Sequence, residues 1–350
     1  MKKEILMCCS DLSVQGGMVS VIKNYLDFSN WGEYEIVFIP THIEKNKILV
    51  SLYFAHAYIR IIMAVLTKKI KIAHLHTAER GSFYRKAILV RTLKKMGLKT
   101  IMHHHAAEFE QFYAASSDKK RKFIQNTLEL TDLNIVLSER LVPMIKDKAS
   151  KAKVEVLYNA VGTYDTNPYN PQGRGIIFLG RLGQRKGAYD LLASIKAIDP
   201  YIDSDIRFYL CGDGEIDKIK DKANEMAIEH RIAYIGWIEK EDKNRIFKDT
   251  MINVLPSYNE GLPMSILETM AYGIPNISTN IASIPEVIQP SVNGELITPG
   301  DIDALSNTLL KLINSVEIRK KYSLNSYNLI THKFSLASHI EKVKQIYLNI

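Results

Sequence analysis

Two carboxylates frame the segment EGLPMSILE, in which Glu260 stands at the first position and Glu268 at the last. An apolar, strand-like run at 252–257 precedes the segment, and Pro263 is well placed at the first position of a predicted helix. We therefore expect Glu260 in the loop before the helix and Glu268 on the helix, roughly 7 to 8 Å along the axis from Pro263. Two carboxylates at this spacing could each bind hydroxyl groups of a different sugar.

The start of this predicted helix also favours an anion. The backbone N–H groups of residues 261–265 have no partner within a helix, and the helix dipole places positive charge in front of them. A nucleotide sugar has a matching layout, with a hexose and a ribose on either side of a diphosphate. A loop glutamate followed by a solvated helical glutamate would explain the same residues, so other segments must decide.

A basic loop follows the apolar run at 176–180. The sequence FLGRLGQRKG places Arg181 and Lys186 after the carboxyl end of a predicted strand. There a guanidinium can bind phosphate oxygens in a forked geometry and an ammonium can act as a point charge. Solvated loop cations are the alternative, but the position at the end of a strand favours a functional role.

Glycines occur at two further strand ends. Gly16 and Gly17 open a helix after the first strand, and Gly212 and Gly214 follow a later strand in CGDGE. Glycines allow the backbone to approach a ligand closely, and the backbone of Ile238 is placed to meet the edge of a base. The first pair does not form GxGxxG, and a plain tight turn explains it equally well.

The elements that must position these residues alternate between strands and helices. We expect two Rossmann-like α/β domains with parallel sheets that face each other across a cleft, at residues 1–160 and 176–333. Residues 161–175 are turn-rich and predict a linker, and the helical pattern at 334–350 is expected to pack back on the first domain. Strands are expected near 5–9, 35–40, 70–76, 100–105, 134–138 and 154–158, and near 176–180, 207–212, 232–237, 252–257, 276–280 and 295–299.

The composition is that of a soluble globular protein of 350 residues, with 46% hydrophobic and 24% charged residues. The three cysteines lie in apolar strand patterns without CxxC spacing, which indicates reduced core residues of a cytoplasmic protein. The amino-terminal apolar run is too short for a signal peptide and predicts a first strand. The longest apolar segment, 48–66, is interrupted by His56 and Arg60 and has helical periodicity. It predicts a core helix, with a membrane-facing side as an option, rather than a membrane-spanning helix.

Positive charge belongs to the first half of the chain. Residues 1–158 contain 25 Lys and Arg against 15 Asp and Glu, whereas the remaining residues contain 21 against 23. Such asymmetry suggests an anionic membrane, a phosphorylated acceptor or nucleic acid as a partner. Within 85–95, basic residues alternate with Ile88, Leu89 and Leu93, which predicts an amphipathic basic helix suited to an anionic lipid surface or a plain solvated face.

Two sequence patterns resemble metal-binding motifs, but we do not expect either of them to bind a metal. Asp203 and Asp205 form DxD, but they precede a strand in a turn-like segment. His103 and His105 share a strand face, yet no cysteine or carboxylate at a known spacing joins them. We therefore expect no metal.

The motifs GGM, GRLxxxKG, GDGE, PSxxEGLPxxxLE, MAYGIPNI, IPEVI and NGELITPGD, in this order and spacing, resemble the retaining GT-B-fold glycosyltransferases of family four, the glycosyl transferases group 1. The resemblance covers nearly the whole chain and is most specific from Gly180 to Asp301. In the first half it rests on the GG turn, HLHTAERGSFYRK, HHHAAEF and VLSER, which are similar to bacterial polysaccharide-assembly members.

The resemblance implies a role for each candidate residue. Glu260 would bind hydroxyls of the donor sugar and stabilise positive charge near the anomeric carbon, while Glu268 would hold the ribose. Arg181 and Lys186 would neutralise the diphosphate leaving group, and His105 would approach the sugar near the reacting carbon. Further hydrogen-bond donors would come from the backbone of Gly261, Leu262 and Pro263. Two departures affect the fine geometry, because Ala106 and the pair Ala282–Ser283 stand where the family has glycines.

The family's chemistry requires neither a metal nor another cofactor. Attack on the front side of the sugar retains the anomeric configuration, and the leaving phosphate itself accepts the proton. Fixed charges aimed at both separating groups lower the barrier electrostatically. Glu260 should not be equated with a glycosidase nucleophile, since two enzyme carboxylates flanking the bond belong to hydrolysis.

The expected function is the transfer of a hexose from a nucleotide sugar, with UDP favoured over GDP, to a polyprenyl-diphosphate-linked saccharide. The pathway would be capsule, exopolysaccharide or O-antigen assembly, by a cytoplasmic enzyme peripherally attached to the inner face of the plasma membrane. A sugar-nucleotide epimerase or a phosphorylase on the same fold is one alternative. A non-catalytic basic module for membrane or nucleic acid is the other, and the lack of a nucleic-acid motif disfavours nucleic acid as a partner.

Overall fold

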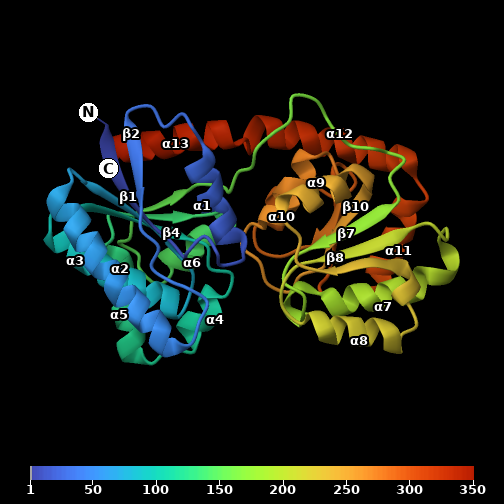
Figure 1. The fold of residues 1–350 in the computed structure, drawn as a ribbon, viewed down its shortest axis with the longest axis horizontal. Helices are drawn as coiled ribbons and strands as arrows, with labels where there is room; N and C mark the ends of the chain where they lie inside the picture. The colour runs from blue at the N-terminus through green and yellow to red at the C-terminus, as the bar shows by residue number, and fades with distance from the viewer. Residues whose placement is uncertain (1) are drawn as a thin grey trace. The chain divides into compact units, whose positions relative to one another are not determined.

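Residues 2–350, which the computed structural model describes, form two units, each built on its own parallel sheet (Figure 1). Unit 1 comprises residues 2–159 together with 337–350, and unit 2 comprises residues 160–336. The last helix therefore belongs to the same unit as the first strand. The prediction of two α/β domains with parallel six-stranded sheets is confirmed.

Unit 1 has the strand order β2-β1-β3-β4-β5-β6. The strand order changes direction beside β1, where β1 pairs with β3, and open α/β sheets bind ligands at such a point. The strands are β1 (Lys3–Cys8), β2 (Tyr34–Phe38), β3 (Ile72–Thr77), β4 (Lys99–His104), β5 (Leu133–Val136) and β6 (Val154–Val156). The helices are α1 (Gly17–Asp27), α2 (Lys47–Thr67), α3 (Gly81–Lys95), α4 (Phe109–Ala114), α5 (Asp118–Leu130), α6 (Val142–Lys146) and α13 (Leu336–Asn349).

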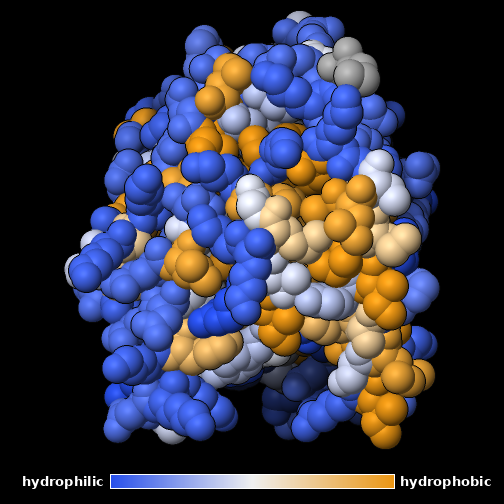
Figure 2. Space-filling view, turned by 90° about the vertical axis from the view of Figure 1, so that its left-hand side faces the viewer, coloured by the Kyte–Doolittle hydropathy of each residue, from blue (hydrophilic) through white to orange (hydrophobic). Residues whose placement is uncertain are grey.

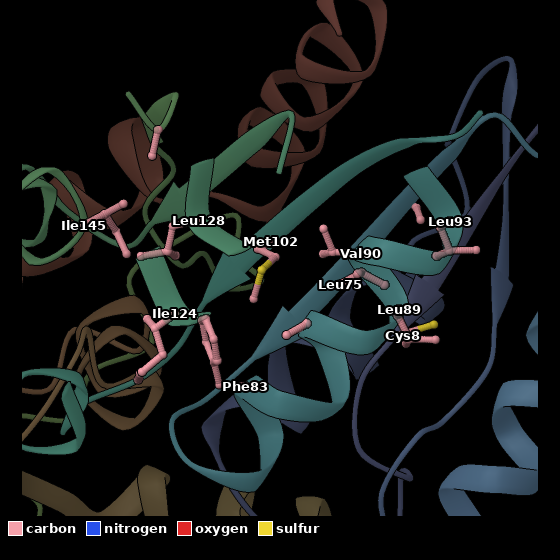
Figure 3. Close-up of a cluster of buried hydrophobic side chains, with 14 of the residues drawn as sticks. Cys8, Leu75, Phe83, Leu89, Val90, Leu93, Met102, Ile124, Leu128 and Ile145 are labelled. Carbon is pink, nitrogen blue, oxygen red and sulfur yellow. The ribbon is translucent and has the colours of Figure 1, made fainter. Parts of the chain in front are cut away.

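The two faces of the unit 1 sheet differ in chemistry. On one face, Leu75 and Met102 pack with Val90 of α3 and other buried apolar side chains (Figure 3). Because successive side chains of a strand alternate between faces, His74 of β3 and His103 of β4 point to the opposite face. Tyr347 of α13 covers His74 there, with its hydroxyl 2.7 Å from the Nδ1 atom of His74.

Helix α3 is a core helix and not the amphipathic surface helix expected for 85–95. Leu89, Leu93 and Lys86 are all fully buried, and Lys86 Nζ donates a hydrogen bond to Thr41 Oγ1 at 2.6 Å. Burial lowers the pKa of the Lys86 ammonium to about 8. Because α3 packs on the sheet, most of its apolar residues face the core, and two of its basic residues, Arg91 and Lys94, bind Thr127 and Asp132 of the same unit.

Helix α2 packs on unit 1 with one side and is exposed on the other, where the sequence predicted a core helix with a membrane-facing side as an option. Ala57 and Ile61 point inward and are buried, but Ile48 and Ile59 on the opposite side are largely exposed. Within residues 2–350, α2 is the one helix that is long and apolar enough to cross a membrane by length and composition. The sequence did not show which side is exposed, because both sides of α2 are apolar and periodicity cannot tell the packed side from the exposed one.

Unit 2 has the strand order β12-β11-β10-β7-β8-β9, which is the order of dinucleotide-binding sheets. The order changes direction between β7 and β10, which pair with each other. The strands are β7 (Gly175–Leu179), β8 (Arg207–Cys211), β9 (Ile232–Gly236), β10 (Thr250–Leu255), β11 (Asn276–Thr279) and β12 (Gly294–Ile297). The helices are α7 (Ala188–Ile198), α8 (Ile216–Glu225), α9 (Lys240–Asp249), α10 (Met264–Ala271), α11 (Ile302–Ile313) and α12 (Val316–Lys333).

The expected strands are all present, with ends shifted by one or two residues. Pro263 is the N-cap of α10 rather than its first helical residue, because its extended ψ of 126° excludes it from the helix. The prediction of free core cysteines is confirmed, since Cys8, Cys9 and Cys211 are buried and unbridged.

Candidate active site

The site in unit 2 lies where the strand order changes direction. Arg181 and Lys186 follow β7, and Glu260 follows the neighbouring strand β10. Parallel neighbours end at the same edge of a sheet, so the topology gathers two cations and one carboxylate at the position where such sheets bind ligands.

Glu260 is buried, with 6% of its surface exposed, and it forms an ion pair with Lys186. Lys186 Nζ donates to Glu260 Oε1 at 2.5 Å, and Ser257 Oγ donates to the same oxygen at 2.8 Å. No protein donor within residues 2–350 reaches the second oxygen, Oε2. The lysine and the serine thus fix the carboxylate while one oxygen stays able to accept from a hydroxyl group of a ligand.

Gly187 brings the two loops together. Its φ is 73°, and a Cβ atom there would lie 2.1 Å from the carbonyl oxygen of Pro256. Only glycine allows the turn before α7 to lie against the end of β10. The backbone bond from Tyr258 N to Arg185 O, at 2.9 Å, holds the same contact and places Lys186 beside Glu260.

Glu268 lies on α10, as expected, and pairs with Lys243 of α9. Lys243 Nζ donates to Glu268 Oε2 at 2.9 Å, and both side chains are partly exposed. Within the described chain, Glu268 Oε1 accepts no hydrogen bond from the protein. The sequence did not reveal Lys243, because a lysine on a highly charged helix resembles any solvated one.

The loop after β8 adds a third basic and acidic pair. Arg181 Nη1 lies 3.1 Å from Asp213 Oδ2, and Asp213 O accepts a hydrogen bond from the amide of Leu182. A Cβ atom on Gly212 would lie 1.9 Å from the carbonyl oxygen of Gly180, so glycine is needed for the two loops to touch. Asp213, which the sequence interpretation passed over inside GDGE, is therefore the partner of Arg181.

The remaining candidates of unit 2 lie around this edge. Gly261, Leu262 and Pro263 are buried immediately before α10, and Gly261 O accepts from Ser283 N at 3.3 Å. Ile238 follows β9 and packs, partly buried, against an apolar cluster of unit 2. Gly214 continues the loop after β8 with a φ of 104°. Their roles in binding a ligand stay predictions.

In unit 1, two glycines open α1 after β1, beside the point where that sheet changes direction. Gly16 is the N-cap residue with a φ of 140°, and Gly17 is the first helical residue. Both are exposed, so the amino end of α1 is accessible to a ligand. The φ of 140° favours glycine here, whereas crowding does not, since a Cβ atom on Gly16 would meet nothing within 4 Å.

His105 follows β4 and is half-buried. Its Nε2 atom lies 2.9 Å from His76 Nδ1, and its amide donates to Thr77 O at 2.8 Å. Burial lowers the pKa of the His105 imidazole to about 3, so the ring is neutral at pH 7. A neutral ring of fixed orientation can exchange hydrogen bonds with a hydroxyl group but supplies no positive charge.

Three buried histidines could offer ligands to a metal. Ring nitrogens of His74, His76 and His103 all lie within 4.8 Å of one another. Burial holds the pKa of each ring below its usual range, so each neutral ring has one unprotonated nitrogen. His74 is hydrogen-bonded on both nitrogens, to Tyr347 and to His103. The sequence interpretation paired His103 with His105 only, although HLHT carried the same alternation. The expectation that no metal is needed stays a prediction.

The aspartates of DxD have a structural role, since Asp203 and Asp205 both lie within 3.4 Å of Arg174 in the turn before β8. The two family glycine positions behave differently. Ala282 has a φ of 44°, whereas Ala106 is buried without a positive φ. Only the alanine at 282 therefore retains the conformation that favours glycine.

Comparison with known proteins gives concordant results. Residues 166–329 match the family model for glycosyl transferases group 1. An uncharacterised 41.2 kDa protein from the cps region of Klebsiella pneumoniae is 26% identical over 96% of this chain and 97% of its own. The UDP-Gal:alpha-D-GlcNAc-diphosphoundecaprenol alpha-1,3-galactosyltransferase of Escherichia coli is 26% identical over 94% of this chain and 86% of its own.

Solved structures share the fold. Sucrose-phosphate synthase from Thermosynechococcus elongatus superposes with a TM-score of 0.81 at 15% identity, covering 99% of both chains. HepE from Anabaena, in complex with UDP, gives 0.77 at 13% identity over 100% of both chains. The fold and the site together define a glycosyltransferase with the GT-B fold. Residues 166–329 are similar to the glycosyl transferases group 1 family, relatives over most of the chain include a named glycosyltransferase, and the prediction of an enzyme of this class is confirmed.

Proposed function

We propose that this glycosyltransferase moves a hexose, with retention of configuration, from a UDP-sugar to a lipid-linked saccharide during assembly of a cell-surface polysaccharide. The name of the Escherichia coli relative includes UDP-Gal and a diphosphoundecaprenol-linked acceptor. The Klebsiella relative comes from a cps region, and the HepE structure contains UDP. The acceptor would be met at the cytoplasmic face of the membrane.

The observation that carries the proposal is the buried pair of Lys186 and Glu260 at the edge where the unit 2 sheet changes direction. Glu260 Oε2 is oriented by two donors on Oε1 and would accept from a hydroxyl group of the donor sugar. Glu268 Oε1 would accept from a ribose hydroxyl in the same way. Two carboxylates with one available oxygen each, separated by the amino end of α10, fit a hexose, a diphosphate and a ribose.

The charges suit the transfer step. The bond between the anomeric carbon and the diphosphate oxygen breaks, and the acceptor oxygen bonds to that carbon on the same face. The acceptor proton passes to the departing phosphate. Lys186 and Arg181 would stabilise the negative charge on the diphosphate, and Glu260 the positive charge on the sugar. Neutral His105 would orient a sugar hydroxyl near the reacting carbon.

The first test is thermal unfolding of the full chain with UDP, GDP or ADP and their common sugar conjugates. A ligand at about 100 times its Kd adds roughly 2.7 kcal/mol to the free energy of unfolding. We expect UDP and one UDP-sugar to raise the Tm, and Glu268→Gln and Lys186→Ala to reduce that rise. No shift with any nucleotide would contradict the proposed donor site.

The second stage measures transfer to polyprenyl-diphosphate-linked saccharides, with and without EDTA, and the anomeric configuration of the product by NMR. Retained configuration and activity in EDTA are expected. An inverted product would contradict the mechanism. Conversion of the nucleotide sugar without an acceptor would indicate an epimerase, and a need for free phosphate a phosphorylase.

A further inference from the structure

Helix α2 presents an apolar stripe to solvent. Ile48, Leu52, Ile59 and Leu66 are exposed by 74%, 63%, 62% and 68% of their surface. Their spacings of four and seven residues place them on one side of a helix. Figure 2, which views unit 1 from its outer side, shows hydrophobic residues gathered along one edge of this face. So large a continuous apolar surface marks a site of interaction.

The opposite side of α2 anchors the helix to unit 1. Ala57 and Ile61 are buried in the core shared with α3, and Tyr58 Oη lies 2.9 Å from Thr92 Oγ1. The helix is long enough to cross a membrane, but crossing would require it to leave this core. It is therefore placed to lie along a surface rather than to span one.

The charges around α2 select the kind of surface. Residues 45–71 contain six Lys and Arg, and no Asp or Glu occurs between 45 and 78. Exposed lysines stand at both ends of the helix, with Lys45 and Lys47 before it and Lys69 after it, while Lys68 is paired with Glu4 at 2.8 Å. A second copy of the chain would bring basic ends against basic ends in either orientation, which disfavours a symmetric dimer. An anionic lipid surface attracts both ends.

We propose that α2 is the element that docks this protein on an anionic lipid bilayer. The exposed stripe enters the boundary between headgroups and acyl chains, and the lysines at the two ends bind lipid phosphates. This inference deepens the proposed function, because it names the surface on which the enzyme would meet a lipid-linked acceptor. It rests on the proposed function for the reason why the protein docks, but not for the docking itself. It replaces α3, whose Lys86, Leu89 and Leu93 are buried against the sheet, as the membrane-binding helix.

The test is flotation of the full-length protein with vesicles of phosphatidylcholine alone or mixed with phosphatidylglycerol, at low salt and without nucleotide or acceptor. We expect binding to the anionic vesicles only. The double variant Ile59→Glu/Leu66→Glu should lower the partition coefficient at least tenfold, while its Tm stays unchanged because both side chains point to solvent. The matched control is Leu324→Glu, an equally exposed position on α12, which should bind as the wild type does.

The electrostatic part is tested separately. Three single variants, Lys45→Gln, Lys47→Gln and Lys69→Gln, should each lower the partition coefficient about fivefold at low salt. High salt should remove most of this difference. Wild-type protein that stays unbound, or a double variant that binds as well as the wild type, would overturn the proposal. A dimer that the double variant abolishes, without vesicle binding, would assign the stripe to a second copy. Sugar transfer does not enter this assay, so failure of the proposed function leaves its outcome readable.

Discussion

Strands β3 and β4 of unit 1 carry neutral histidines toward their carboxyl ends, whereas ion pairs lie beyond the strand ends of unit 2. In unit 1, His74 is buried against Tyr347 and stacks on His103, and burial lowers the pKa of both histidines. In unit 2, Lys186 with Glu260 and Lys243 with Glu268 occupy the equivalent edge. Two sheets of similar architecture thus offer a hydrogen-bonding surface in one case and a charged one in the other. The difference teaches that the chemistry of such a site depends on the few residues after each strand, and not on the sheet.

The largest expected effect is a difference in acid stability, in which unit 1 unfolds at a higher pH than unit 2. A histidine whose folded pKa lies below its unfolded value stabilises the fold fully above about pH 6.5 and loses that contribution as the pH falls. At pH 5 each buried histidine of this kind costs about 2 kcal/mol, and unit 1 has five of them, which together approach the stability of a domain. They are His74, His76, His103, His104 and His339. Unit 1 should unfold between about pH 6 and 5.

The two tryptophans allow each unit to be followed alone. Trp31 is buried in unit 1, and Trp237 lies in unit 2. Fluorescence of Trp237→Phe during an acid titration reports unit 1, and that of Trp31→Phe reports unit 2. In unit 2, Arg231 lowers the pKa of the Asp199 carboxyl, so stability linked to this group is lost only at more acidic pH. If both variants unfold at the same pH, the expected difference in acid stability between unit 1 and unit 2 is wrong.

The second effect compares two ion pairs of the unit 2 site, Lys186 with Glu260 and Lys243 with Glu268. Lys186→Met leaves a buried carboxylate with Ser257 as its remaining partner and should lower the free energy of unfolding by about 3 kcal/mol. Lys243→Met removes the partner of the more exposed Glu268 and should cost less than about 1 kcal/mol. Urea unfolding at pH 7 measures both. The double variant Lys186→Met/Glu260→Gln should recover part of the free energy of unfolding that Lys186→Met loses. Equal losses in Lys186→Met and Lys243→Met would contradict the expected difference between the two pairs.

The smallest effect concerns strained backbone. Ala282→Gly relieves the left-handed conformation at φ 44° and should raise the free energy of unfolding by about 0.5 kcal/mol, net of the entropy that glycine adds to the unfolded chain. In unit 1, Arg80, with a φ of 56°, offers the parallel change. Ala193→Gly in the regular helix α7 is the control and should cost about 1 kcal/mol. Thermal unfolding measures both variants. If Ala282→Gly lowers the free energy of unfolding as much as Ala193→Gly does, the backbone at residue 282 is not strained.

The sequence predicted the sheets well because strand-helix alternation is a local signal. It also predicted that Lys186 and Glu260 gather at one edge, since each directly follows a buried strand. It did not predict Lys243 or the contact between His76 and His105, because these depend on which helix or strand becomes a neighbour in space. The packed sides of helices α2 and α3 were not predicted for the same reason, because the rest of unit 1 determines which apolar side packs.

Helix α13 has a consequence for the order of events during synthesis. Its residues His339 and Tyr347 complete the packing around Tyr25 and His74, yet the ribosome makes them after all of unit 2. At about 5–20 residues per second, residues 160–336 take roughly 10 to 35 s to make. Unit 2 is one uninterrupted stretch and can fold as it emerges. The amino-terminal unit, although made first, is the last to be completed, and its histidine-lined face stays open to chaperones until then.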